Sequence, residues 1–166
     1  MTIEEVSKLL MENNPRTAKE LKALGIQVRT LGSGAYRHAY KVSRLPLVIK
    51  IPFNQRMSLK HAEAEIKAVR QIIRLKKYRT LKKYMPNIYF YNPKTRVIGM
   101  EYCPTENNPY LSNIELLLND LLEEIWPDAA TSSVDVHRHN IGFNRNGDVK
   151  IIDLGYFSER GRGWSS

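Results

Sequence analysis

Three polar residues late in the sequence, Asp135, Asn140 and Asp153, have types and spacing that could hold a metal ion and move a proton. They lie in DVHRHNIGFNRNGDVKIIDLGY, residues 135–156, where two short apolar runs flank an Asn-Gly pair that favours a hairpin turn. Because a hairpin brings its ends together, Asn140 and Asp153 are expected to be neighbours. Two hard oxygen ligands side by side suit Mg²⁺ that carries phosphates. Asp135 could then accept a proton from an attacking hydroxyl, or orient it. Each of these residue types is also common in ordinary loops, so the hairpin geometry is what favours a site.

A second group of residues, upstream, could bind phosphate. A glycine segment between two strand-like stretches reads Gly32-Ser33-Gly34. Such a segment lets backbone N–H groups approach phosphates, although a simple hairpin turn is the more frequent explanation. Lys50 is centred in the apolar run LVIKIP, where a lysine is costly unless its ammonium finds a partner. Glu65 on the following helix is a candidate partner and Glu63 is the alternative, which the sequence alone does not separate.

The segments that must position these residues form an alternation of helices and strands. The hydrophobic periodicity and the cap and turn residues predict helices at 2–13 and 16–24, strands within 26–43 and 45–52, a long basic helix at 57–83 with a break near 78–80, strands at 87–92 and 96–102, a helix at 112–126 and a hairpin at 141–153. Thr2 with Glu5, and Ser112 with Glu115, have the spacing of capping boxes.

The composition is that of a globular protein. Hydrophobic residues make up 42% and charged residues 26% of the 166 residues, which are ordinary values. No apolar run approaches the roughly 18–20 residues that a membrane span requires. The first residues are acidic and amphipathic, unlike a signal peptide. Cys103 is the single cysteine, which excludes an internal disulfide and fits a reducing compartment. We therefore expect a cytoplasmic protein without a membrane segment.

Positive charge is in excess and is unevenly spread. The sequence has 26 Lys and Arg against 17 Asp and Glu, a formal net charge of +9. Eight of the basic residues fall within residues 67–83 without an acidic neighbour: Lys67, Arg70, Arg74, Lys76, Lys77, Arg79, Lys82 and Lys83. Such a cluster favours an anionic partner, either an acidic protein surface or a nucleic acid. A solvated helix face is the alternative interpretation.

The order of these elements and motifs, over roughly residues 26–160, resembles that of the protein-kinase-like fold. The glycine segment resembles the phosphate-covering loop, Lys50 the lysine of strand three, and Glu65 its partner on helix C. VIGMEYCP, residues 97–104, resembles the last N-lobe strand and the hinge, with Met100 as gatekeeper. Residues 135–140 resemble the catalytic loop, and IIDLGY the metal-binding Asp-Phe-Gly segment with leucine in place of phenylalanine.

The resemblance implies an α+β, bilobal fold. Residues 1–25 would be a helical extension, 26–103 an N-lobe with an antiparallel sheet, and 104–166 a strongly reduced helical C-lobe. Eleven residues follow Gly155, so we expect no peptide-binding platform in this sequence.

The resemblance also implies ATP and Mg²⁺ as cofactors. Lys50, positioned by Glu65, would bind the α- and β-phosphates. Asn140 and Asp153 would hold Mg²⁺, and Asp135 would serve as the catalytic base. The backbone of three hinge residues would contact adenine: Glu101, Tyr102 and Cys103.

Several positions depart from the family pattern. Arg37 replaces the third glycine of the phosphate-covering loop. Ser133-Val134 precedes Asp135 in place of His-Arg, so the usual anchor of a phosphorylated activation segment is lacking. His137 stands where Ser/Thr kinases carry lysine, and D-x-H-x-x-N is similar to the loop of aminoglycoside phosphotransferases and atypical kinases. His137 would contact phosphate or pack beneath the site; both interpretations stay open.

These features lead to three functional hypotheses. The first is a minimal ATP- and Mg²⁺-dependent kinase of the Ser/Thr type that acts on a protein substrate. The second is a pseudokinase-type binding module that docks on a regulatory partner protein. The replacement of the His-Arg pair supports this hypothesis. The third is a small-molecule or RNA-associated atypical kinase, suggested by D-x-H-x-x-N and by the basic helix at 67–83.

Overall fold

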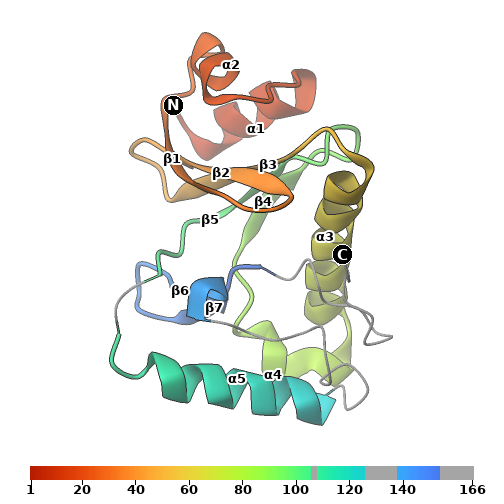
Figure 1. The fold of residues 1–166 in the computed structure, drawn as a ribbon, viewed down its shortest axis with the longest axis vertical. Coiled ribbons are helices and arrows are strands. Elements are labelled where there is room, and N and C mark those ends of the chain that lie inside the picture. The colour runs from red at the N-terminus through yellow and green to blue at the C-terminus, as the bar shows by residue number, and fades with distance from the viewer. Residues whose placement is uncertain (106–107, 126–137, 154–166) are drawn as a thin grey trace. The chain divides into compact units, whose positions relative to one another are not determined.

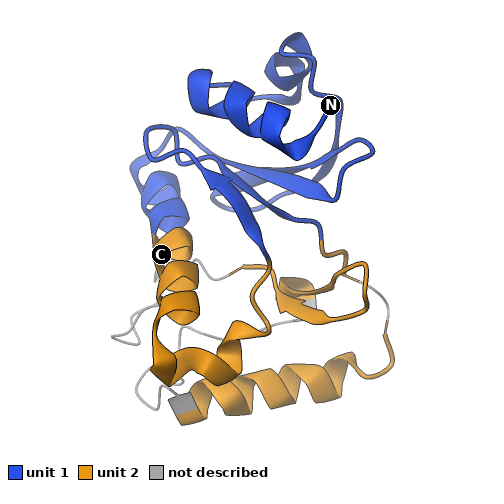
Figure 2. Ribbon diagram, turned by 180° about the vertical axis from the view of Figure 1, so that it is seen from behind, with its two compact units in different colours: residues 1–63, 87–102 blue, residues 64–86, 103–166 orange. Residues whose placement is uncertain are grey.

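The computed structural model describes residues 1–105, 108–125 and 138–153 (Figure 1). The chain divides into two compact units, residues 1–63 with 87–102 and residues 64–86 with 103–166 (Figure 2). The predicted α+β class with an antiparallel sheet is confirmed, because the first unit contains a five-stranded antiparallel sheet. Within the described ranges, no helix combines the length and the apolar character that crossing a membrane requires.

The chain begins with two short helices whose ends follow the sequence signals. These helices are α1 (Ile3–Glu12) and α2 (Ala18–Ala23). The hydroxyl of Thr2 accepts a hydrogen bond from the N–H of Glu5 at 3.2 Å, as the capping-box spacing predicts. Thr17 caps α2 in the same way. Gly25, just after α2, has a φ of +84°, a conformation that glycine adopts without strain.

The sheet of the first unit has the order β1-β2-β3-β5-β4, with every neighbouring pair antiparallel. Its strands are β1 (Val28–Ser33), β2 (Arg37–Val42), β3 (Leu47–Pro52), β4 (Ile88–Tyr91) and β5 (Ile98–Glu101). All six residues of β3 are buried. Because side chains alternate along a strand, Leu47, Ile49 and Ile51 lie on one face of β3 and Lys50 on the other.

One face of this sheet forms a hydrophobic core with the N-terminal helices. The core contains Val6, Leu10, Leu21, Ile26, Tyr40, Val42, Leu47, Ile49, Ile51, Phe90 and Val97. The helices thereby cover the face of β3 that bears Ile49, and Lys50 lies on the opposite face. The N-terminal helices are consequently an integral part of the first unit.

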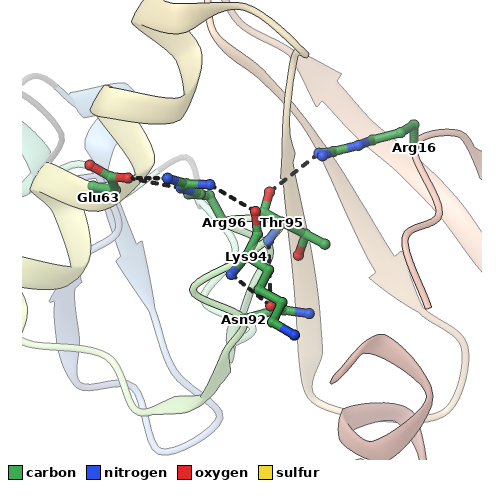
Figure 3. A network of polar contacts seen from close by, with 6 residues as sticks. All are labelled: Arg16, Glu63, Asn92, Lys94, Thr95 and Arg96. Atoms are coloured by element: carbon green, nitrogen blue, oxygen red, sulfur yellow. Dashed lines mark hydrogen bonds and ion pairs between the residues drawn. The ribbon is translucent and has the colours of Figure 1, made fainter. Parts of the chain in front are cut away.

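A polar network around the turn between β4 and β5 holds the helices against the sheet (Figure 3). The side-chain carbonyl of Asn92 accepts a hydrogen bond from the N–H of Lys94 at 2.9 Å. Its amide donates to the carbonyl of Leu10, near the end of α1, at 2.9 Å. The guanidinium of Arg16 donates to the carbonyls of Thr95 and Pro52 at 3.3 and 3.4 Å.

Replacing Asn92 by alanine should destabilise the protein by about 2 kcal/mol, because buried backbone groups lose their partner. Asn92 is 3% exposed. The free energy of unfolding, measured by urea denaturation with circular dichroism, tests this. Asn13→Ala is the matched control, since the exposed Asn13 amide also donates to a carbonyl of α1, that of Leu9, at 2.9 Å. We expect the control to lose about 0.5 kcal/mol or less. Equal losses in the two variants would contradict the role given to the turn.

The second unit consists mainly of helices and one hairpin. Helix α3 (Arg56–Arg74) begins in the first unit and continues in the second. It is followed by η1 (Lys76–Tyr78), α4 (Arg79–Lys82), α5 (Leu111–Ile125), η2 (Arg138–Asn140), β6 (Ile141–Phe143) and β7 (Val149–Ile151).

One predicted detail of these helices is confirmed in part and one is wrong. The long basic helix is first interrupted at Leu75, which has extended φ and ψ of −88° and 130°, and again at Tyr78, within the predicted range, where η1 ends and α4 begins. The extended Leu75 interrupts the helical path, and Tyr78 after it is fully buried. Helix α5 begins at Leu111, so Ser112 lies inside the helix and is not its cap.

The hairpin of β6 and β7 turns at the predicted Asn146-Gly147 pair. Five residues, 144–148, separate the strands, and a hydrogen bond from the N–H of Asn144 to the carbonyl of Asp148 at 3.0 Å encloses residues 145–147. Phe143 pairs with Val149, and Gly147 has a φ of +82°. The side-chain oxygen of Asn144 accepts hydrogen bonds from the N–H groups of Asn146 at 3.0 Å and Asp148 at 2.9 Å. A type I turn followed by a glycine of positive φ is a common form of this loop.

Candidate functional site

Lys50 lies in the middle strand of the sheet and is only 7% exposed. It pairs with Ala39 of β2 on one side and with Ile98 of β5 on the other. Val48 and Met100, which pair with each other, share its face of the sheet and are also buried. An ammonium in such apolar surroundings requires anionic or polar partners.

The glycine segment lies at the connection between β1 and β2. Gly32 pairs with Ala39, which is also the neighbour of Lys50 in the sheet. A Cβ added to Gly32 or to Gly34 would meet no atom within 4 Å, and neither glycine has a positive φ. The fold therefore does not require glycine at these positions, and close approach of a ligand is a reason for glycine there. Arg37, which takes the place of the third glycine, is 8% exposed.

Ser33 within this segment contacts the facing strand. Its hydroxyl is hydrogen bonded to Nδ1 of His38, with which it pairs across the hairpin. The imidazole of His38 in turn lies edge-on to Phe53, with ring centroids 4.7 Å apart. These contacts hold the side chain of Ser33 against His38 of the facing strand β2.

The predicted hinge begins at Glu101, the last residue of β5. Met100, the expected gatekeeper, is 2% exposed. The N–H of Glu101 donates to the carbonyl of Asn87 at 2.8 Å, and the N–H of Tyr102 donates to the carbonyl of Pro46 at 3.0 Å. These two N–H groups would have to break existing bonds to reach a base, which restricts how the hinge could contact adenine.

The ring of Tyr102 lies beside two cations of the first unit. The guanidinium of Arg29 donates to the phenol oxygen at 3.2 Å, and the ammonium of Lys41 lies 5.1 Å from the ring centroid. Burial, and after it the charge of Arg29, lowers the pKa of Lys41. The Lys41 ammonium also donates to the carbonyls of Val42 and Leu45 at 2.7 and 2.6 Å. The position of the Tyr102 side chain is thereby fixed.

The structure separates the surroundings of the two candidate glutamates. The carboxylate of Glu63 is half exposed. Its Oε1 atom lies 2.8 Å from both Nε and Nη2 of Arg96 (Figure 3). Arg96 has a φ of +62° in the turn between β4 and β5, and sequence reasoning did not anticipate its role. Glu65, in contrast, is 2% exposed. Glu63 thus has a surface partner, whereas the carboxylate of Glu65 is buried. That Glu65 pairs with Lys50 stays a prediction.

The hairpin of the second unit brings the two expected metal ligands to the same end. Ile141 pairs with Ile151, and the N–H of Ile152 donates to the carbonyl of Asn140 at 2.8 Å. Asp153 is the next residue along, and both it and Asn140 are half-buried. The other two expected functional residues of this region, Asp135 and His137, lie outside the described residues.

The same hairpin packs against the end of the predicted hinge, within the second unit. The N–H of Phe143 donates to the carbonyl of Pro104 at 3.0 Å. A Cβ on Gly142 would lie 2.2 Å from the carbonyl oxygen of Cys103, so only glycine fits there. On its other side, the N–H of Ile151 donates to the carbonyl of Tyr84 at 2.8 Å. Sequence reasoning missed the close approach of Gly142 to Cys103, although a glycine inside a strand is a signal of close backbone approach.

Comparison with known proteins gives distant structural likenesses only. No protein-family model matches the sequence, and neither does any curated protein. A solved structure of APH(2″)-IIa in a ternary complex with streptomycin and ATP is similar over 93% of this chain and 71% of that chain. The TM-score is 0.48 and the sequence identity is 15%.

Proposed function

We propose that this chain is an ATP- and Mg²⁺-dependent phosphotransferase, and that its acceptor is a hydroxyl group of a protein. The observation that carries the proposal is the burial of Lys50 in the middle strand of a five-stranded antiparallel sheet, on the face that the N-terminal helices leave uncovered. A lysine is kept in such a position at a cost, and binding of phosphate oxygens is a role that uses the buried charge.

The residues of the first unit are assigned to the nucleotide. Lys50 would bind the α- and β-phosphates, and the open backbone of Gly32 and Gly34 would cover them. Met100 and the backbone of the hinge would contact the adenine. Glu65, buried in the second unit, would position the Lys50 ammonium, because Glu63 is already paired with Arg96.

The hairpin of the second unit is assigned to the metal. Asn140 and Asp153 supply one amide and one carboxylate at the same end of the hairpin, which is a donor set that suits Mg²⁺. Bound Mg²⁺ would neutralise charge on the phosphates. Asp135 would accept the proton of the attacking hydroxyl, and His137 would contact phosphate. Such a reaction depends mainly on positioning and on charge stabilisation.

Addition of Mg-ATP should stabilise the protein, because a ligand that binds only the folded state shifts the unfolding equilibrium. At a hundred times Kd the expected gain in the free energy of unfolding is about 2.7 kcal/mol. Thermal melting with and without Mg-ATP measures this gain. Transfer of label from γ-labelled ATP to candidate acceptors then tests the reaction. Stabilisation without transfer to any acceptor would favour the docking module, and transfer to a small molecule alone would correct the acceptor class.

The variant Gly34→Val distinguishes nucleotide binding from a general loss of structure. A Cβ at position 34 meets no atom of the protein within 4 Å, so the melting temperature without nucleotide should stay within about 2 °C. The Mg-ATP shift should fall, since on this proposal the side chain would occupy the space of the phosphates. An undiminished shift in this variant would show that the glycine segment does not cover the nucleotide.

A further inference from the structure

The basic residues of the cluster at 67–83 are exposed to solvent and belong to the second unit. We use the term basic surface for its eight side chains, all of which are exposed: Lys67, Arg70, Arg74, Lys76, Lys77, Arg79, Lys82 and Lys83. The apolar residues that alternate with them are buried: Ile66, Val69, Ile72, Tyr78, Leu81 and Met85. Because the apolar residues must pack inward, the cations have to face solvent.

The stretch of sequence that carries these cations contains no acidic residue. Between Ile66 and Met100 the sequence contains no Asp or Glu. Of the two acidic residues that precede this stretch on α3, Glu65 is buried, and Glu63 is ion-paired with Arg96. Lys150 of β7 adds a further cation, since its ammonium donates to the carbonyl of Lys83 at 2.9 Å. Residues 67–99 thus contribute cations and no anion to this part of the sequence.

The composition of the basic surface argues against a membrane and against a protein partner. A helix that lies on a membrane needs an apolar face to insert, and the apolar face of α3 is occupied by the core of this protein. Protein interfaces are depleted in lysine and built around aromatic anchors. Here five of the eight cations are lysines, and Ile73 is the one exposed large apolar residue that the structure shows between residues 67 and 83.

The basic surface also lacks the rings on which single-stranded bases stack. Tyr78 is fully buried, and Tyr84 is half-buried, with the Lys83 ammonium 5.0 Å from the centre of its ring. Stacking on exposed aromatic faces is the usual basis of single-strand binding. Lys67, Arg70 and Arg74, at spacings of three and four, project from one side of α3. A row of cations without stacking rings suits a continuous phosphate backbone.

We propose that the basic surface binds the sugar-phosphate backbone of a nucleic acid duplex without reading its sequence. The contacts are charge-assisted hydrogen bonds from arginine and lysine to phosphate oxygens. Duplex RNA and duplex DNA share this chemistry, and comparison of the two identifies which is the ligand. The proposal does not depend on phosphate transfer, because it involves neither ATP nor the assigned metal ligands.

The test is fluorescence anisotropy of the full chain with labelled 20-base-pair RNA and DNA duplexes over a series of salt concentrations. Affinity should fall steeply with salt, in proportion to the number of phosphates contacted. The triple variant Lys67→Glu, Arg70→Glu and Arg74→Glu should bind at least about tenfold more weakly, and its salt dependence should lose a slope of about 1 for each contact removed.

A matched control separates the basic surface from net charge. Lys8→Glu, Lys19→Glu and Lys22→Glu make the same change of charge at three exposed positions of the N-terminal helices. This control should bind as the unaltered chain does, and circular dichroism should show both variants folded. Equal weakening in both triple variants, absence of duplex binding at low salt, or equally effective competition by polyglutamate or anionic vesicles would each overturn the proposal. Asp153→Ala should leave duplex binding unchanged, which keeps this test separate from that of the proposed reaction.

Discussion

Asp153→Ala will leave a folded protein that transfers phosphate at least about a thousandfold more slowly. Asp153 lies two residues after Ile151, the last residue of β7, and its side chain is half-buried at the end of the hairpin. The hairpin is closed by backbone bonds, including that from Ile152 to Asn140, which alanine at position 153 leaves in place. The loss should therefore appear in the rate of transfer from γ-labelled ATP, and not in the unfolding transition.

Asp148→Ala is the matched control on the same hairpin. Asp148 is exposed in the loop at the other end, where its carboxylate accepts a hydrogen bond from the amide of Asn144 at 3.3 Å. This variant removes the same charge from the same element and should keep its activity. If transfer survives Asp153→Ala, or survives Asp135→Ala, the assigned mechanism is wrong. If both aspartate variants on the hairpin lose activity equally, the charge of the hairpin matters and not a ligand at position 153.

The parts of the fold that sequence reasoning predicted are those that depend on nearby residues. Thr2 and Glu5 form their cap because both partners lie within one helical turn. The Asn146-Gly147 pair turns the hairpin because Gly147 adopts a positive φ at no cost. The hairpin then places Asn140 near Asp153, as a consequence of pairing alone.

The parts that could not be predicted depend on residues far away in the sequence. The surroundings of Glu63 and Glu65 differ because Arg96, in a distant turn, reaches Glu63. Helix α3 ends at Arg74, although no glycine or proline follows to mark its end. Just beyond this end, the side chain of Tyr78 is fully buried. Local propensity carries no information on such contacts, because their free energy comes from tertiary packing.

The replacement of Gly142 by alanine should cause the largest loss of stability, about 3 kcal/mol or more. The new Cβ would lie 2.2 Å from the carbonyl oxygen and 2.8 Å from the carbonyl carbon of Cys103. These are backbone atoms, and the adjacent Phe143 N–H to Pro104 carbonyl bond of 3.0 Å ties the same two segments together. Relief of the clash must therefore separate the hairpin from the end of the hinge.

Gly32→Ala and Gly99→Ala are the comparisons that make the measurement specific. Alanine at position 32 meets no atom within 4 Å, so its free energy of unfolding in urea should be unchanged or slightly higher. Alanine at position 99 meets the ring of Phe90 at 2.1 Å, and a side chain can shift where a backbone cannot, so the loss should be smaller than for Gly142→Ala.

Because the second unit would lose the contact between Cys103 and the hairpin, Gly142→Ala should also reduce the stabilisation by Mg-ATP. Unaltered stability of Gly142→Ala would show that residues 103–104 do not hold the hairpin.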